Sequence, residues 1–127
     1  MRMKLLLDSH VIVWWALYPG RLRTTTRDAI ISPGNEVFLS AASVWELGLK
    51  IARGKLALPA DYAPRLLAHG FEELGVSIGH AARSTTLPPL HGDPFDRLLI
   101  AQALEEGLML VTSDQAILRY DVPAMEA

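Results

Sequence analysis

The segment from His91 to Ala103, HGDPFDRLLIAQA, has two aspartates three residues apart directly before an apolar run with helical spacing. Asp93 followed by Pro94 is typical of a helix N-cap and first helical residue, which puts Asp96 near the positive end of the helix dipole. Carboxylates are also the ligands that Mg²⁺ and Mn²⁺ prefer. The two aspartates are therefore candidates for helix capping and for a metal site.

Three more of the fourteen acidic residues occupy comparable positions. Asp8 and Asp114 follow apolar runs, so each can cap the helix that comes after it. In the segment SVWE, Ser43 and Glu46 have the spacing of a capping box, and Lys50 is an i,i+4 partner for Glu46. Helical periodicity does not direct Glu46 toward any site. Taken singly, each of these acids is better explained as a cap than as a metal ligand.

Apolar runs alternate with helical patterns along the chain. Strands are expected at residues 4–7, 37–39, 71–76 and 108–112. Helices are expected at 9–17, 24–31, 40–56 with a break at Gly54, 60–70, 79–86 and 94–106, with a last helical turn from Asp114 and an irregular tail around Pro123. Continuous apolar strands between helices predict an α/β fold of three layers, α/β/α, with a central, mainly parallel sheet. Residues 1–127 are expected to form a single domain.

In a parallel sheet, the carboxyl ends of strands and the amino ends of helices share one edge, where α/β proteins bind ligands. Asp8 and Asp114 follow strand ends, whereas Glu46, Asp93 and Asp96 lie in the expected first turns of helices. All five should therefore gather on one rim. Crowded carboxylates raise one another's pKa unless a cation neutralises them. The sequence thus predicts a site for Mg²⁺, with Mn²⁺ as the alternative.

Composition limits the other functions. Half of the residues are apolar and the mean hydropathy is +0.22, which suggests surface covered by a partner, such as a homodimer. The net charge of −2 gives no general positive field, so a polyanion must be held by local groups. The absence of cysteine excludes disulfides and thiolate sites. Asp8 and His10 interrupt the stretch that a signal peptide would need, and the apolar run 11–17 is too short for a membrane span, so we expect a cytoplasmic protein without a membrane anchor.

Four segments together resemble a known family: KLLLDSHVIVWW, SAASVWELGLKIARGKLALP, LPPLHGDPFDRLLIAQALEEG and LVTSDQAILRY. In order and spacing they are similar to the PIN-domain ribonucleases that serve as VapC-type toxins of bacterial toxin-antitoxin pairs, from about residue 4 to residue 120. The resemblance implies a PIN-like fold and an acidic metal site that cuts RNA. The catalytic and metal-ligating residues that it implies are Asp8, Glu46, Asp96 and Asp114, with Asp93 as an accessory acid and Thr112 as a supporting hydroxyl.

The mechanism that we expect is hydrolysis of an RNA phosphodiester by water activated on one or two Mg²⁺ ions. The substrate is expected to be an RNA such as tRNA or ribosomal RNA, and the resemblance adds a cognate antitoxin protein as partner. His10 and His91 are interpreted as structural groups near helix starts and are left out of the catalytic set. Candidate phosphate contacts are Arg21, Arg23, Arg53 and Arg97. Arg97 could equally pair with Asp93.

Two other function classes stay open, and a third is argued against. A phosphoacceptor receiver domain needs a lysine after its last strands, and the last lysine here is Lys55. A metal-dependent phosphomonoesterase would use similar acids and release inorganic phosphate from small esters. In a non-catalytic binding module the acids would only cap helices. Asp8→Asn and Asp96→Asn would then cost roughly 1 kcal/mol each, and removal of metal would change nothing.

Overall fold

The computed structural model describes residues 2–127 and has a sheet of five parallel strands. The strands are β1 (Lys4–Leu7), β2 (Glu36–Ser40), β3 (Glu72–Leu74), β4 (Met109–Thr112) and β5 (Ala124–Glu126), in the spatial order β3-β2-β1-β4-β5. In the central strand β1, Leu6 is in register with Phe38 of β2 and with Leu110 of β4. The sheet is therefore built around the apolar run expected at residues 4–7.

Helices fill the connections between the strands. They are α1 (Ser9–Leu17), a short 3-10 helix (Pro19–Arg21), α2 (Thr24–Ile31), α3 (Ala41–Ala52), α4 (Tyr62–Ala68), α5 (Ile78–Thr86), α6 (Pro94–Glu106) and α7 (Gln115–Leu118). The expected helices 9–17, 24–31 and 94–106 have the predicted bounds, and the others differ by a few residues. Over residues 2–127, no helix has both the length and the apolar character that a membrane span requires.

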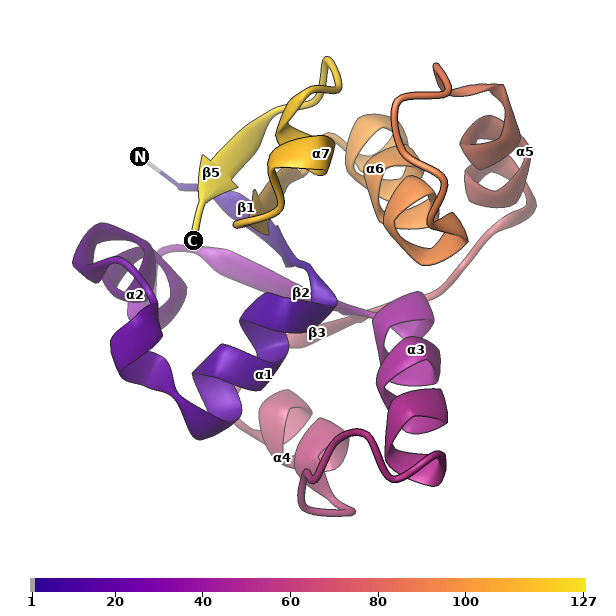
Figure 1. Cartoon of the computed structure of the whole chain (residues 1–127). Coiled ribbons are helices and arrows are strands. Elements are labelled where there is room, and N and C mark those ends of the chain that lie inside the picture. Colours follow the sequence, from indigo (N-terminus) through magenta and orange to yellow (C-terminus); the bar gives the residue numbers. More distant parts are fainter. Residues whose placement is uncertain (1) are drawn as a thin grey trace.

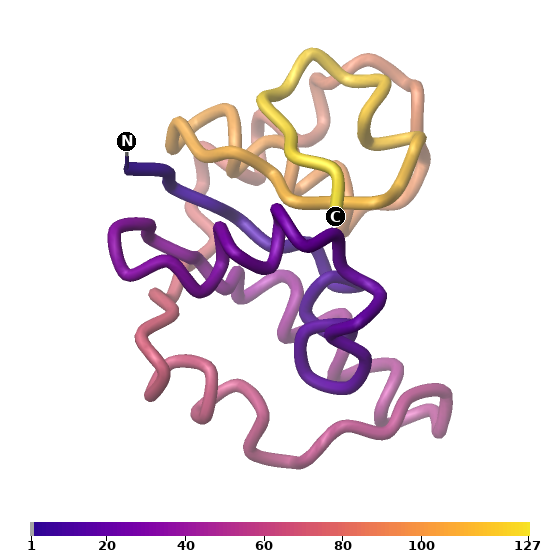
Figure 2. Tube along the Cα trace, turned by 90° about the vertical axis from the view of Figure 1, so that its left-hand side faces the viewer, coloured from indigo at the N-terminus to yellow at the C-terminus, as the bar shows by residue number. Residues whose placement is uncertain are grey.

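The sheet has a separate apolar core on each face. Leu5 and Leu7 of β1 pack with residues of α1, α2, α3 and α4, whereas Leu6 packs with residues of α6 and α7. Figure 1 shows α1 and α4 on one side of the sheet and α6 on the other, with α5 outside α6. In Figure 2, turned by 90°, the early helices lie below β1 and the late segments lie above it. The prediction of an α/β/α fold with a parallel sheet is confirmed.

The tail after Pro123 was expected to be irregular, and this expectation is wrong. Residues 124–126 form β5, which pairs with β4 in parallel, with Met125 opposite Val111. The N–H of Leu110 donates to the carbonyl of Pro123 at 2.9 Å, and the N–H of Ala127 donates to the carbonyl of Thr112 at 3.0 Å. A strand of three residues is too short to show an alternating side-chain pattern. Only its backbone pairing with β4 defines it as a strand.

Because the strands are parallel, their carboxyl ends lie at one edge of the sheet. β1 comes forward from the fainter background of Figure 1 and leads directly into α1. Helices α3 and α7 also begin just after a strand. Helix α6 ends close to the start of β4, at the opposite edge of the sheet, so its own amino end lies at the carboxyl edge. The amino ends of four helices therefore surround the carboxyl ends of β1, β2 and β4.

Candidate metal centre

Asp8 caps helix α1 and is held from two sides. Its Oδ1 accepts the N–H of Val11 at 2.8 Å, and its Oδ2 accepts the hydroxyl of Thr112 at the end of β4. The Thr112 hydroxyl in turn accepts the N–H of Asp114 at 3.0 Å. Burial raises the pKa of the Asp8 carboxyl, although the hydrogen bonds from Thr112 and Val11 act in the opposite direction. The ends of two neighbouring strands thus fix one buried carboxylate.

Glu46 reaches the same place from the second turn of α3. Its Oε1 accepts the hydroxyl of Ser9 at 2.5 Å, and its Oε2 lies 3.4 Å from Nζ of Lys50. The capping box expected for Ser43 and Glu46 is wrong, because the helix begins earlier. Its N-cap is Ser40, whose hydroxyl accepts the N–H of Ala42 at 3.1 Å. This earlier start leaves the Glu46 side chain free to face α1.

Asp93 and Asp96 divide the two roles expected for them. Asp93 is the N-cap of α6, and its Oδ1 accepts the N–H groups of Phe95 at 2.8 Å and of Asp96 at 3.2 Å. The carboxylate of Asp96 is turned instead toward His91, whose Nε2 lies 2.7 Å from its Oδ2. Burial, followed by the negative charges of Asp93 and Glu46, raises the pKa of Asp96 to about 6 against the opposing effect of His91. Asp96 is thus a carboxylate in an environment with too little positive charge.

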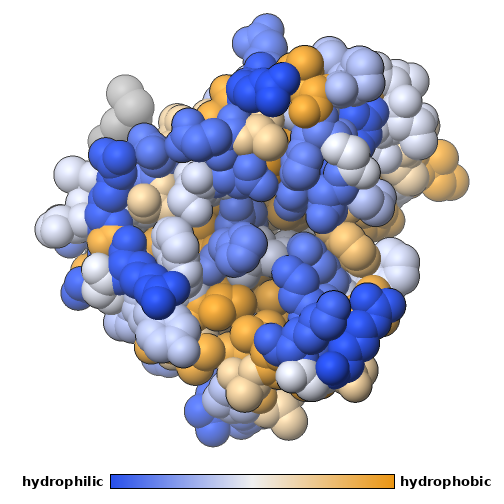
Figure 3. Space-filling model, viewed as in Figure 1, coloured by the Kyte–Doolittle hydropathy of each residue, from blue (hydrophilic) through white to orange (hydrophobic). Residues whose placement is uncertain are grey.

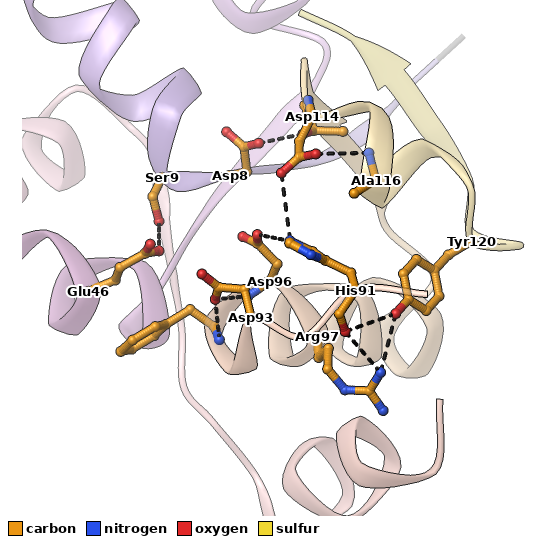
Figure 4. Close-up of polar contacts among 12 residues, drawn as sticks. Asp8, Ser9, Glu46, His91, Asp93, Asp96, Arg97, Asp114, Ala116 and Tyr120 are labelled. Carbon is orange, nitrogen blue, oxygen red and sulfur yellow. Dashed lines mark hydrogen bonds and ion pairs between the residues drawn. The ribbon is translucent and has the colours of Figure 1, made fainter. Parts of the chain in front are cut away.

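Asp114 completes the set of acids from the end of β4. It is the N-cap of α7, where its Oδ1 accepts the N–H of Ala116 at 2.8 Å. Its Oδ2 lies 3.7 Å from Nε2 of His91. The imidazole of His91 therefore faces the carboxylates of both Asp96 and Asp114, as Figure 4 shows. This position of His91 was not expected from the sequence, although the motif HGDPFD puts the residue only two positions before the N-cap.

Arg97 fixes the loop that carries His91. Its Nη2 donates to the carbonyl of Leu87 at 2.9 Å, and its Nη1 donates to the carbonyl of Pro88 at 3.0 Å and to that of His91 at 3.3 Å. Nη1 also lies 3.2 Å from the hydroxyl of Tyr120. The expected pairing of Arg97 with Asp93 is therefore wrong, and its role as a phosphate contact stays a prediction. Its guanidinium is used to hold the loop against α6.

One pocket at the carboxyl edge of the sheet collects these side chains. Its cavity of about 180 Å³ is lined by Asp8, Glu46, Asp93, Asp96 and Asp114, together with Ser9, His10, Lys50 and His91. In Figure 4 the carboxylates of Asp8, Asp96 and Asp114 lie around a common space, with Glu46 at its side. Figure 3, viewed as in Figure 1, shows hydrophilic side chains across the middle of the molecule and an apolar patch below them. The structure brings all five predicted acids together.

The donor set fits a hard divalent cation. Ligand atoms of His91, Asp96 and Asp114 lie within 4.8 Å of one another. Carboxylate oxygens suit Mg²⁺ and Mn²⁺, and a cation among them would offset the repulsion that contributes to the raised pKa of Asp96. The pocket can therefore hold a divalent ion. The assignment of Asp8, Glu46, Asp96 and Asp114 as its ligands stays a prediction.

Comparison with known proteins identifies the family of the chain. The family model of the PIN domain matches residues 5–123. The chain is 36% identical over 121 residues to Ribonuclease VapC22 of Mycobacterium tuberculosis, which covers 93% of this chain and 92% of the relative.

Similar folds are found among solved structures. The structure of VapBC2 from Rickettsia felis bound to a promoter DNA fragment matches with a TM-score of 0.72 at 16% identity, over 98% of both chains. A toxin-antitoxin complex from Klebsiella pneumoniae matches with a TM-score of 0.65 at 18% identity, over 95% of both chains. At these identities the structures support the fold alone, and the family assignment comes from the sequence matches. The chain belongs to the PIN-domain family, among the VapC ribonucleases.

Proposed function

We propose that this protein is a Mg²⁺-dependent endoribonuclease, with Mn²⁺ as an alternative ion, and that it acts as the toxin of a toxin-antitoxin pair. The observation that carries the proposal is a pocket in which acids that follow β1 and β4 meet acids from α3 and the start of α6. This pocket belongs to a chain that is 36% identical to Ribonuclease VapC22. The proposal therefore combines a site that suits metal-assisted hydrolysis with a relative that is named as a ribonuclease.

The acids take different parts in this proposal. Asp8, Glu46, Asp96 and Asp114 hold the ion, directly or through water, and Asp93 is an accessory acid. Thr112 supports the site because its hydroxyl fixes both Asp8 and the backbone of Asp114. When bound, Mg²⁺ supplies a Lewis acid that lowers the pKa of a water molecule and stabilises charge on the phosphate oxygens.

The protein's own residues prepare this chemistry. The hydrogen bonds to Val11 and Thr112 hold Asp8 in one orientation before substrate arrives. Ser9 does the same for Glu46. Such preorganisation avoids the cost of collecting charged side chains during the reaction. Because water and not the RNA 2′-hydroxyl is the nucleophile, we expect products with 5′-phosphate and 3′-hydroxyl ends.

Cleavage of a mixed pool of tRNA and ribosomal RNA tests the proposal. The wild-type protein should cleave the pool with Mg²⁺, and both EDTA and Asp8→Asn should abolish cleavage. The Asn side chain keeps the size of Asp8 and a capping oxygen, so the variant should remain folded. Lys4→Gln, at the opposite end of β1, is the matched control that should cleave normally. End mapping completes the test, because 2′,3′-cyclic phosphate ends would contradict this mechanism, and release of inorganic phosphate from small esters would favour a phosphomonoesterase.

A cognate antitoxin protein is the partner that we propose. Support comes from the similar structures, which include VapBC2 from Rickettsia felis and a toxin-antitoxin complex from Klebsiella pneumoniae. An antitoxin that presents an arginine to the acidic pocket would block it by charge pairing. Co-expression of the cognate antitoxin should restore growth of cells that the wild-type chain arrests.

A homodimer and a cytoplasmic location complete the proposed picture. Ile78, at the start of α5, is 91% exposed, and α5 packs on α6 at the outside of the fold. An apolar residue so exposed is consistent with a surface that another molecule covers. Sedimentation equilibrium of the wild-type protein and of Ile78→Lys tests the dimer, which the lysine should weaken.

A further inference from the structure

A second groove opens beside the acidic pocket, between α1 and the last turns of α3. Its cavity of about 160 Å³ shares Ser9, His10 and Lys50 with the acidic pocket and extends to Lys55. Figure 1 shows α1 and α3 as neighbours on the same side of the sheet. The two cavities are therefore adjacent, one lined by the carboxylates and the other by Lys50 and Lys55.

The second groove concentrates the lysines of the protein. The chain has only three lysines, Lys4, Lys50 and Lys55, and two of them line this groove. The ammonium group of Lys50 already forms an ion pair, because its Nζ lies 3.4 Å from Oε2 of Glu46. Lys55 is exposed, as is His10. In a protein with a net charge of −2, two lysine ammonium groups therefore lie beside the carboxylates.

The turn at the end of α3 is what brings the two lysines together. Residues five apart on a continuous helix are about 140° apart around the axis, so Lys50 and Lys55 would face different sides. The helix ends at Ala52, and Gly54 adopts a φ of +70°. This left-handed residue folds the chain back, so that the N–H of Lys55 donates to the carbonyl of Lys50 at 2.9 Å. Glycine favours this φ because it has no Cβ.

We propose that this groove binds a backbone phosphate of the RNA next to the one that is cleaved. The inference rests on the proposed ribonuclease function and names a separate part of the substrate-binding surface. The acidic pocket repels the phosphates that flank the scissile bond, so nearby positive charge is needed to hold them. Lysine ammonium groups bind phosphate as point charges. Lys55 is the specific residue that we assign to this contact, with Lys50 and His10 beside it.

Lys55→Gln is the informative variant, because Lys50 also contacts Glu46 and its replacement would disturb the acidic pocket. Steady-state cleavage of a single-stranded RNA oligonucleotide should show KM raised about fivefold to tenfold with kcat nearly unchanged. The dependence of log affinity on log salt should become less steep by about 0.7, which corresponds to one lost phosphate contact. The affinity for Mn²⁺ alone should not change. Lys55→Arg should retain binding, and Lys55→Glu should weaken it more than Lys55→Gln does.

The matched control is Lys4→Gln, which removes the third lysine at the opposite edge of the sheet, where it faces Glu36. Equal effects of Lys4→Gln and Lys55→Gln on KM, or an unchanged salt dependence for Lys55→Gln, would overturn the proposal. Anisotropy binding of labelled RNA to Asp96→Asn proteins, with and without Lys55→Gln, separates this inference from the nuclease activity. If the wild-type protein leaves RNA intact, the proposed function fails, while the binding assay still decides the role of the groove.

Discussion

The protein contains two histidine-carboxylate contacts that are almost identical in length but differ in their surroundings. Nε2 of His80 lies 2.8 Å from Oε2 of Glu106, and Nε2 of His91 lies 2.7 Å from Oδ2 of Asp96. Both contacts join a histidine to a residue of α6. The distances alone would give the two pairs the same role.

Both ring nitrogens of His80 have hydrogen-bond partners, and the contact with Glu106 links α5 to α6. The histidine side chain is 3% exposed, and its Nδ1 accepts the N–H of Ser77 at 3.0 Å. The Ser77 hydroxyl accepts the N–H of His80 at 3.1 Å, which completes a capping box at the start of α5. Glu106 is 47% exposed, so water can solvate its charge. This pair is a structural link between α5 and α6.

The contact of His91 lies among partly buried carboxylates whose negative charges are not fully neutralised by nearby cations. Asp96 is 17% exposed and His91 is 23% exposed, and the imidazole also faces Asp114. Burial and the neighbouring Asp93 and Glu46 raise the pKa of Asp96 to about 6. The two pairs therefore differ in burial and in the negative charge around the carboxylate, and the proposed function predicts the environment of Asp96 where a cation binds. Evolved sites retain such repulsion where a ligand relieves it.

Asp96→Asn gives the largest effect expected from this comparison. The substitution removes a carboxylate charge from the pocket, so cleavage of RNA with Mg²⁺ should fall at least about 1000-fold, since metal assistance provides several kcal/mol of stabilisation. The unfolding free energy of the metal-free protein should stay equal or rise, because the substitution removes a buried charge and its repulsion with Asp93 and Glu46. Initial cleavage rates and urea unfolding in EDTA measure the two quantities.

Glu106→Gln is the matched control for this prediction, because it neutralises the carboxylate of the other pair. Its cleavage rate should equal that of the wild-type protein. Comparable loss of activity in the two variants would show that the pocket has no special role. Retained activity in Asp96→Asn would remove Asp96 from the catalytic set.

His80→Ala should have its effect on stability. Removal of the buried ring leaves the N–H of Ser77 without its side-chain acceptor and opens a cavity between α5 and α6, which should cost about 2 kcal/mol of unfolding free energy. Urea unfolding measures this cost. The folded protein should keep its cleavage rate below the unfolding transition. A variant that is fully stable but inactive would place His80 among the functional residues.

The same contrast explains what the sequence could predict. Asp8, Asp93 and Asp114 were expected as caps because capping depends on neighbouring residues, and each does cap its helix. The convergence of the acids followed from the parallel sheet, which continuous apolar strands predict. The start of α3 could not be fixed, because both Ser40 and Ser43 are suitable caps and only the end of β2 selects Ser40.

The positions of His91 and Arg97 depend on contacts that no local pattern contains. The loop before α6 folds over that helix, and the Arg97 guanidinium holds it through three carbonyl groups of residues 87–91. An arginine in an acidic motif is typical of phosphate binding or ion pairing, so its use on backbone carbonyls was not expected. Strand β5 was not predicted for a similar reason, because only its hydrogen bonds with β4 make it a strand.

The smallest effect expected is the pH dependence of stability in the metal-free protein. Since the pKa of Asp96 in the folded protein is about 6, above the value of about 3.9 expected in the unfolded chain, the folded state binds more protons between these values. Stability should therefore increase as the pH falls from 7 to 5 and be lost as the pH rises through 6. The raised pKa of Asp8 acts in the same direction. Partial exposure of Asp96 limits its contribution to about 1 kcal/mol.

Urea unfolding in EDTA at pH 5, 6 and 7 measures this dependence in the wild-type protein and in Asp96→Asn. The difference between their unfolding free energies should shrink toward pH 5, where the wild-type carboxyl becomes protonated and no longer carries a buried charge that neighbouring carboxylates repel. His80→Ala should keep the wild-type dependence, because its ring lies outside the acidic pocket. If the difference between wild type and Asp96→Asn is constant with pH, the charge in the pocket is already compensated, and the contrast between the two histidine pairs loses its physical basis.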